Sequence, residues 1–175
     1  SDVSKWLDSS SNSNDVLQAT ATEQPAYSAG TLTFVSADVN NLQTAAQIEL
    51  SGEFTIGIRM FPTSFSNVVI ADNTIANEFI KITANNTIRI KVDGAVGDFT
   101  LDSGTFGDDY IVFTRDGSNL VTLWKNGVAQ ADTETRSGTV DIDCIGVRSP
   151  DLNAYAGTIK EIQIYSSRTS DLTAN

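Results

Sequence analysis

Pairs of carboxylates are the side chains in this sequence with the clearest chemical potential. Asp141 and Asp143 lie two residues apart in an alternating stretch, so their carboxylates share one face of the expected strand. Two such groups can hold a hard cation, or act as general acid and general base in glycoside hydrolysis. They can equally be two solvated acids on the outer face of an acidic protein. The spacing leaves these three interpretations open.

The sequence contains no histidine, and this narrows the chemistry. Without an imidazole there is no Ser-His-Asp or Cys-His nucleophile, and the usual zinc and iron ligand sets are excluded. Cys144 is the single cysteine and has no basic residue beside it, so we expect a small, buried, apolar side chain there. Hard-cation, carboxylate or substrate-assisted chemistry remains.

Acidic residues outnumber basic ones by 22 to 11 among 175 residues, so the formal net charge is −11. A surface this negative repels phosphate backbones and anionic lipids, so we expect neither nucleic acid binding nor membrane insertion. The composition, with 40% hydrophobic and 19% charged residues, is typical of a folded domain. Its length predicts a single domain over residues 1–175. Because the sequence starts at Ser1 without a methionine, we expect a processed chain or a piece of a longer one.

Trp124 is the candidate for ligand binding. It lies in an alternating stretch whose same face carries Leu120 and Thr122. An exposed indole ring can stack on the apolar face of a sugar. A strand tryptophan in a β-sandwich is, however, more often packed against its neighbours. The sequence therefore nominates Trp124 as a sugar platform, with packing as the alternative.

A period of two dominates the chain and defines the elements that must position these groups. Apolar and polar residues alternate over residues 54–60 and 88–92, as in strands with one buried and one solvated face. Further strands are expected at residues 32–35, 68–71, 79–83, 98–101, 110–115, 120–125, 140–147 and 158–165. Hairpin turns are expected at Asn85-Asn86, Asp93-Gly94, Asp116-Gly117 and Asn126-Gly127. One short helical turn is expected near residues 170–172.

Four segments resemble, in order, those of one known superfamily. The Trp6-Leu7-Asp8 segment, with Asn14-Asp15 and Gln18 after it, is similar to that superfamily's entry motif. Three further segments resemble its first long core strand, its central hairpin and its closing strand, namely residues 51–56, 113–127 and 155–165. On these segments the chain resembles the laminin G-like, concanavalin A-like lectin and glucanase superfamily, in the form appended to bacteriophage and extracellular proteins.

The resemblance implies an all-β fold, a two-sheet antiparallel jelly-roll sandwich of the concanavalin A-like type. It also implies a non-catalytic recognition or structural module at a virion surface or outside the cell. Its partners would be cell-surface glycan or other virion proteins of a phage capsid or tail. The alternative is a glycan hydrolase, but the superfamily's glucanases carry a Glu-x-Asp-x-x-Glu motif whose spacing the six glutamates here never match. We therefore do not expect an enzyme.

The resemblance also makes calcium the cofactor to consider, because related domains bind calcium through loop carboxylates, amides and backbone carbonyls. The candidate ligands are Asp72 and Asn73 in one loop, and Asp151 and Asn153 in another. Loops rich in Asp and Asn are also common as simple turns. Neither pair is preferred.

A departure from the superfamily's pattern concerns the start of the domain. Members usually have a strand upstream of the tryptophan segment, whereas five residues precede Trp6. Without that strand a sheet edge would be open, and open edges readily recruit another strand. We therefore expect a neighbouring segment or a second copy at this edge, and a homo-trimer would suit a phage appendage.

Overall fold

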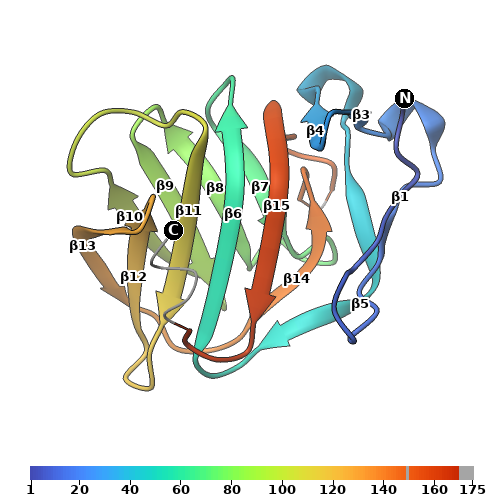
Figure 1. Cartoon of the computed structure of the whole chain (residues 1–175). Helices are drawn as coiled ribbons and strands as arrows, with labels where there is room; N and C mark the ends of the chain where they lie inside the picture. Colours follow the sequence, from blue (N-terminus) through green and yellow to red (C-terminus); the bar gives the residue numbers. More distant parts are fainter. Residues whose placement is uncertain (149, 170–175) are drawn as a thin grey trace.

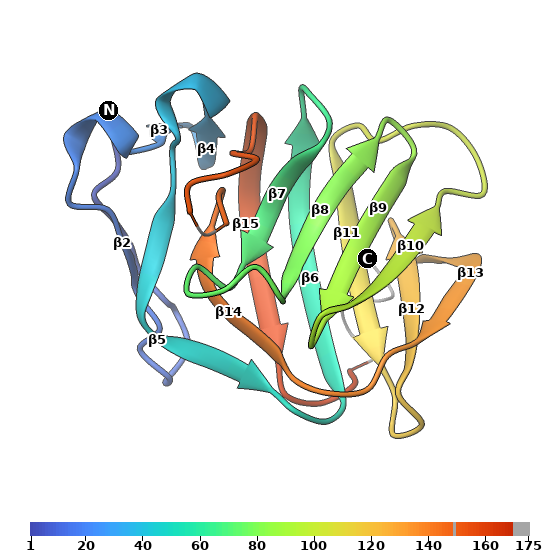
Figure 2. The same cartoon turned by 180° about the vertical axis from the view of Figure 1, so that it is seen from behind.

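The computed structural model describes residues 1–148 and 150–169. Two antiparallel sheets lie face to face and form a sandwich, seen from its two sides in Figures 1 and 2. In this part of the chain, one sheet has eight strands in the order β1-β2-β5-β14-β7-β8-β9-β10. The other has seven, in the order β13-β12-β11-β6-β15-β4-β3. The predicted all-β, two-sheet antiparallel jelly-roll sandwich is confirmed.

The strands are shortest where β1, β2 and β3 form one end of the sandwich. The eight-stranded sheet comprises β1 (Lys5–Trp6), β2 (Val16–Leu17), β5 (Leu42–Leu50), β14 (Val140–Ile145), β7 (Asn67–Ala71), β8 (Phe79–Ala84), β9 (Thr87–Val92) and β10 (Ala95–Thr100). The seven-stranded sheet comprises β13 (Val128–Thr135), β12 (Leu120–Lys125), β11 (Asp109–Arg115), β6 (Phe54–Pro62), β15 (Gly157–Tyr165), β4 (Thr31–Phe34) and β3 (Ala26–Ser28). Two 3-10 turns, Ala21–Glu23 and Ser36–Asp38, lie in the connections. Over the described residues, the structure has no helix with the length and apolarity needed to cross a membrane.

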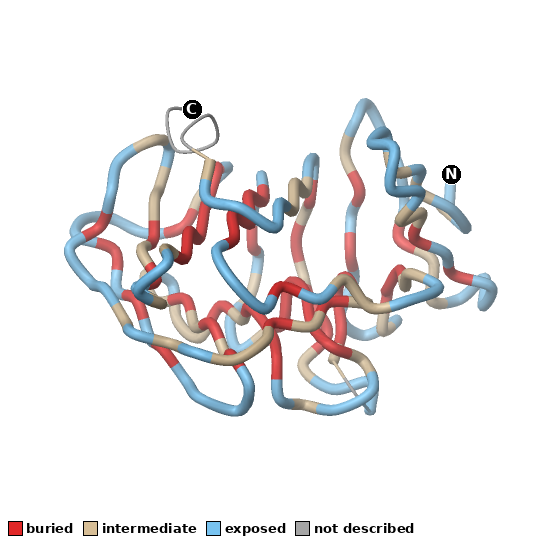
Figure 3. The backbone as a smooth tube through the Cα atoms, turned by 90° about the horizontal axis from the view of Figure 1, so that it is seen from below, coloured by how far each residue is buried: buried red, intermediate tan, exposed pale blue. Residues whose placement is uncertain are grey.

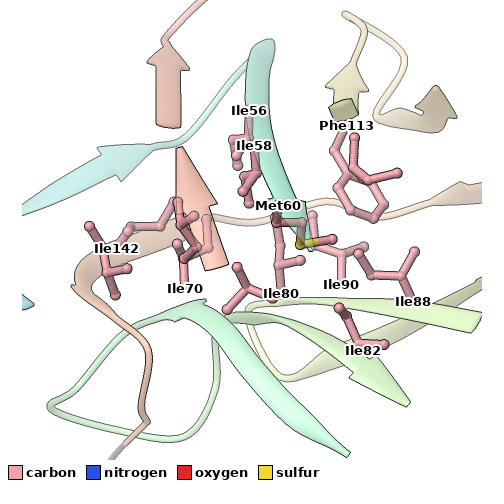
Figure 4. Packing of buried hydrophobic residues seen from close by; sticks show 14 of the residues in the cluster. Ile56, Ile58, Met60, Ile70, Ile80, Ile82, Ile88, Ile90, Phe113 and Ile142 are labelled. Atoms are coloured by element: carbon pink, nitrogen blue, oxygen red, sulfur yellow. The ribbon is translucent and has the colours of Figure 1, made fainter. Parts of the chain in front are cut away.

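The core lies between the sheets, where the inward faces of alternating strands meet (Figure 4). Ile56, Ile58 and Met60 of β6 are at most 1% exposed, as are Ile80 and Ile90 of the facing sheet. Full burial of such a side chain contributes about 1.5–3 kcal/mol. A slip of one residue would move each strand's apolar set to the solvent side, so burial fixes the register. Figure 3 shows the buried positions gathered along the strands and the exposed ones along the turns.

Two of the predicted turns carry the positive φ angles that their residue types favour. Asp93-Gly94 has φ angles of 45° and 79°, and Asn126-Gly127 has 50° and 79°. The turn predicted at Asp116-Gly117 does join the paired strands β11 and β12, but it is longer than two residues and its positive φ falls on Asn119 (63°). Asp116 has a different role there, since its Oδ1 accepts a hydrogen bond from the N–H of Ser118 (2.8 Å).

Two long strands were not predicted from the sequence. β5 contains two consecutive alanines and is buried mainly at its ends, Leu42 and Leu50, so its apolar period is weak. β13 is an edge strand that is largely exposed, and Gln130 is its buried position. The alternation of apolar and polar residues identifies strands that have one buried face. It cannot identify strands in which both faces are mostly exposed to solvent. The helical turn expected near residues 170–172 lies outside the described residues.

The first three residues pair with β3 at the edge of the seven-stranded sheet. The N–H of Val3 donates to the carbonyl of Pro25 (2.9 Å), and the N–H of Tyr27 donates to the carbonyl of Ser1 (2.7 Å). After this pairing the chain crosses to the eight-stranded sheet, where Trp6 pairs with Val16. Residues 1–3 thus occupy the edge that the sequence comparison expected to be open.

Arg115, at the end of β11, is a fully buried cation (0% exposed) that joins two distant connections. Its Nε and Nη2 donate to the carbonyls of Gly52 (2.7 Å) and Leu50 (2.9 Å), between β5 and β6. Its Nη1 donates to the carbonyl of Gly138 (2.7 Å), between β13 and β14. The guanidinium carbon also lies 4.7 Å from the centre of the Phe54 ring. Burial lowers the pKa of Arg115, and the carbonyl oxygens supply the compensating hydrogen bonds.

Replacing Arg115 should therefore destabilise the fold strongly. Arg115→Met keeps much of the volume but leaves buried carbonyls without donors, so we expect a loss of about 3–5 kcal/mol in the free energy of unfolding. The matched control is Arg59→Met, because Arg59 forms an exposed ion pair with Asp108 and should cost at most about 1 kcal/mol. Urea titrations measure both values. Equal losses in the two variants would contradict this role of Arg115.

Candidate functional site

Acidic side chains from separate parts of the chain gather on the outer face of the eight-stranded sheet. In β14, Val140 and Ile142 point into the core, so Asp141 between them points outward. Asp72 directly follows β7 and Glu78 directly precedes β8. The N–H of Asp72 donates to the carbonyl of Glu78 (3.1 Å), which closes the loop beside β14, the neighbour of β7 in the sheet.

Hydrogen bonds hold this loop against β14. The N–H of Asn73 donates to Asp143 Oδ1 (2.6 Å). Asp72 Oδ1 accepts from the N–H and the hydroxyl of Thr74 (both 2.6 Å) and from the side-chain amide of Gln47 (3.0 Å). The structure thus brings together two pairs that lie far apart in the sequence. They are the loop pair Asp72 and Asn73 and the strand pair Asp141 and Asp143. With Glu78 they form what we call the acidic cluster: Asp72, Asn73, Glu78, Asp141 and Asp143.

Burial leaves the acidic cluster short of hydrogen-bond donors. Asp72 is 1% exposed and Glu78 is 4% exposed. Within the described part of the chain, four buried oxygens of the cluster have no hydrogen-bond partner, and they are Asp72 Oδ2, Asn73 Oδ1, Glu78 Oε2 and Asp141 Oδ1. Buried oxygens without donors are rare because each one costs free energy. The cluster therefore favours uptake of a proton or a cation.

The pKa values in the acidic cluster reflect the same shortage. Desolvation, and then the negative charges of Asp72 and Asp141, raise the pKa of Glu78 to about 7. Desolvation also raises the pKa of Asp141 and, against a hydrogen bond from the N–H of Asn73, that of Asp143. When protonated, Glu78 can donate to Asp72. Sequence reasoning missed Glu78, because a single glutamate in front of a strand has no recognisable spacing.

The acidic cluster fits the calcium that the fold resemblance implies. Calcium takes carboxylate, amide and carbonyl oxygens, and these are the atom types that lack donors here. Among the described residues, no three carboxylates converge closely enough to ligate one ion together. A cation would therefore be held by one or two carboxylates, Asp72 and Glu78, with Asn73, backbone carbonyls or water completing the shell. Bound there, it would neutralise the buried charge and tie the loop to β14.

The second candidate pair, Asp151 and Asn153, lies in a different environment. Both residues have positive φ angles, 53° and 56°. In the amide orientation that satisfies both of its polar atoms, Asn153 Oδ1 accepts from Arg148 Nε (2.9 Å) and Nη2 (3.2 Å), so this amide oxygen faces a cationic group. Asp151 is exposed and lines a hollow of about 500 Å³ together with Glu23. The structure does not bring this pair to the acidic cluster, and its role as a calcium ligand stays a prediction.

Trp124 lies on the outer face of the seven-stranded sheet. Its ring is half-buried and packs against Tyr110 and Val112, and its Nε1–H donates to Thr114 Oγ1 (3.2 Å). Part of the Trp124 side chain is therefore packed against neighbouring residues, as the alternative interpretation of the sequence expected. Its role as a sugar platform stays a prediction.

No protein family model matches this sequence, and no curated protein matches it. Solved structures of similar fold do exist. The binding domain of Paraclostridial Mosquitocidal Protein 1 has a TM-score of 0.53 and 12% identity, covering 99% of this chain and 45% of that chain. The LG1-3 region of the laminin alpha2 chain has a TM-score of 0.58 and 11% identity, covering 82% of this chain and 28% of that chain.

A third similar structure is domain 4 of AbnA, a GH43 extracellular arabinanase from Geobacillus stearothermophilus, in complex with arabinotriose. It has a TM-score of 0.52 and 11% identity, and the alignment covers 98% of this chain and 80% of that chain. This chain spans less than half of the mosquitocidal and laminin chains. At these identities the likeness shows the fold alone. The chain thus has the lectin-like β-sandwich fold that laminin LG domains share.

The pH dependence of stability should report on Glu78. Folding raises its pKa from 4.5 to about 7, so the folded state holds a proton that the unfolded state releases in this range. The contribution of Glu78 to the free energy of unfolding is therefore complete below pH 4.5 and is lost as the pH rises towards 7. Glu78→Gln cannot ionise, so urea titrations across this range should show a flatter profile for the variant. Glu161→Gln, at an exposed position, should keep the wild-type profile, and identical profiles for all three proteins would refute the assignment.

Proposed function

We propose that this domain is a non-catalytic recognition module that binds glycan at a virion or cell surface, with the acidic cluster as a calcium site that supports its loops. Two structures of similar fold favour recognition, since one is a binding domain and another is a domain in complex with arabinotriose. The observation that carries the proposal is the set of buried oxygens without donors in the acidic cluster. A structural cation satisfies them, whereas a solvated surface would not need one.

Glycan hydrolysis is the second candidate, and the pKa of Glu78 is the observation that favours it. A pKa of about 7 suits a general acid, as in glycosidases that pair two carboxylates. A general acid must, however, come within hydrogen-bond reach of the glycosidic oxygen. Glu78 is 4% exposed, and its loop is tied to β14 by the hydrogen bond to Asp143. Burial of this degree favours a binding site over a catalytic one.

The charge of the protein limits the partners that this proposal allows. A formal net charge of −11 disfavours nucleic acid and anionic lipid as partners, and it favours uncharged ligands and cations. We propose a place on a virion surface or outside the cell, where calcium is available and glycan is presented. Attachment to other virion proteins of a capsid or tail, in a homo-trimer, belongs to the same proposal.

Calcium should stabilise the protein through the acidic cluster. At a hundredfold excess over the dissociation constant, a ligand of the folded state adds about 2.7 kcal/mol. We expect calcium to raise the melting temperature of the wild-type protein, and EDTA to reverse the effect. Asp72→Asn keeps the hydrogen-bond acceptor for Thr74 but removes the charge, so it should abolish the shift. Asp151→Asn is the matched control in the other loop. A shift abolished by Asp151→Asn and kept by Asp72→Asn would place the ion in the wrong loop for this proposal.

Glycan binding without hydrolysis is the direct test of function. The labelled wild-type domain should bind a subset of an array of neutral and charged glycans. Reducing-sugar release from the bound glycans should stay at the level of a buffer blank. Binding to no glycan would refute the recognition role. Release of sugar that is lost in Glu78→Gln would favour the hydrolase instead.

A further inference from the structure

Residues from both sheets line a slot at the end of the sandwich where β1 and β3 lie. These two strands are near the N-terminus in Figure 1. The volume of the slot is about 410 Å³, which is in the range of small-ligand sites. Leu32 and Ile159 form its apolar floor, being 4% and 0% exposed and paired with each other across β4 and β15. The slot thus reaches down to the margin of the hydrophobic core.

Two aromatic side chains line this slot, one from each sheet. Tyr27 is paired with Leu32 across β3 and β4, and it is 47% exposed. Trp6 comes from β1 of the other sheet and packs partly against the core. The turn at Ala29 and Gly30, with φ angles of 49° and 80°, sets the register that puts Tyr27 beside Leu32. The slot is thus lined by one aromatic side chain from each sheet.

Two lysines also line the slot, and each is ion-paired. Lys5 Nζ lies 2.6 Å from Asp15 Oδ2, and Lys160 Nζ lies 2.6 Å from Asp108 Oδ2, a carboxylate that Lys160 shares with Arg59. An ammonium group has three donors, so each lysine keeps donors for a ligand while it is ion-paired. The slot therefore offers hydrogen-bond donors beside its aromatic side chains.

We propose that this slot binds a neutral pyranose ring of a surface glycan. The inference rests on the proposed recognition function and gives it a location and a ligand class. The apolar C–H face of such a ring suits the aromatic faces of Trp6 and Tyr27, and its hydroxyl oxygens suit the lysine donors. A neutral ring is favoured over an acidic sugar because both lysines already have a carboxylate partner and the protein carries a net charge of −11, which repels a further carboxylate.

The two tryptophans of the protein make the location measurable. Trp6 lies in the slot, and Trp124 lies on the outer face of the seven-stranded sheet. In Trp124→Phe, Trp6 is the only indole, and in Trp6→Phe, Trp124 is the only one. Each variant is titrated with neutral trisaccharides of glucose, galactose, mannose and arabinose while tryptophan fluorescence is recorded. We expect a saturable change for at least one sugar in Trp124→Phe, and none in Trp6→Phe.

Tyr27→Ala in the Trp124→Phe background should raise the dissociation constant at least tenfold. The matched control is Tyr165→Ala, because Tyr165 is also about half exposed (44%) but does not line the slot. Lys160→Met gives a second variant, in β15 of the same sheet as Tyr27, with weaker binding expected. Circular dichroism and urea titration confirm that each variant is folded.

Three results would overturn the slot assignment while leaving the recognition function standing. They are a fluorescence change confined to Trp6→Phe, binding that Tyr27→Ala and Lys160→Met leave unchanged, and tighter binding of sialylated or uronic trisaccharides than of neutral ones. A saturable fluorescence change in Trp124→Phe with an apolar peptide, and none with any sugar, would assign the slot to a protein partner instead. Failure of the wild-type domain to bind any glycan on the array would overturn the proposed function as well.

Discussion

The buried guanidinium of Arg115 is the constraint on which the closure of this sandwich depends. A charged group inside a protein is tolerated only when hydrogen bonds replace its hydration. Here carbonyls from two connections supply those bonds, Gly52 and Leu50 from one and Gly138 from the other. Both connections lead into β5 or β14, which pair in the eight-stranded sheet, while Arg115 itself belongs to the seven-stranded sheet. One side chain thus ties the two sheets together at one end of the fold.

Side chains also link the sheets along the edge formed by β10 and β13. The carboxylate of Asp102 accepts from the N–H of Ala131 in β13 (3.0 Å), and that of Asp132 accepts from the N–H of Thr100 in β10 (2.8 Å). Arg136 donates to the carbonyl of Val96 in β10. Each contact satisfies a backbone group that an edge strand would otherwise present to another chain. These charged residues thereby protect the sheet edge from pairing with a strand of another chain.

The two candidate sites divide the chemistry of the protein between them. The acidic cluster is buried, rich in carboxylates and short of donors, so it suits a cation that stabilises the loop between β7 and β8. The slot near β1 and β3 has a largely apolar lining with two aromatic side chains and two ion-paired lysines. In our proposals the first site therefore concerns stability and the second concerns recognition. This separation lets calcium and glycan be tested with different variants.

The sequence by itself determined the fold class and most of the strands, because burial of alternate residues is a local property of each strand. It also predicted that Cys144 is buried, and the side chain is 1% exposed with its pKa raised by burial to about 12. Two-residue turns at Asp93-Gly94 and Asn126-Gly127 followed from backbone conformations that those residue types favour. The long strands that escaped prediction, β5 and β13, are mostly exposed or only partly buried, so their pattern carries little periodic signal.

Only the tertiary structure decided which residues meet. Asp72 and Glu78 reach the strand of Asp141 because β7 lies beside β14 in the sheet, although some seventy positions separate them in the chain. Trp6 and Tyr27 come to line one slot because β1 and β3 are edges of opposite sheets. Strand order and sheet packing are set by the burial of the whole core, to which every strand contributes. The spacing of residues within one segment does not indicate strand order or sheet packing. The residues of each site could therefore be identified only from the assembled sheets.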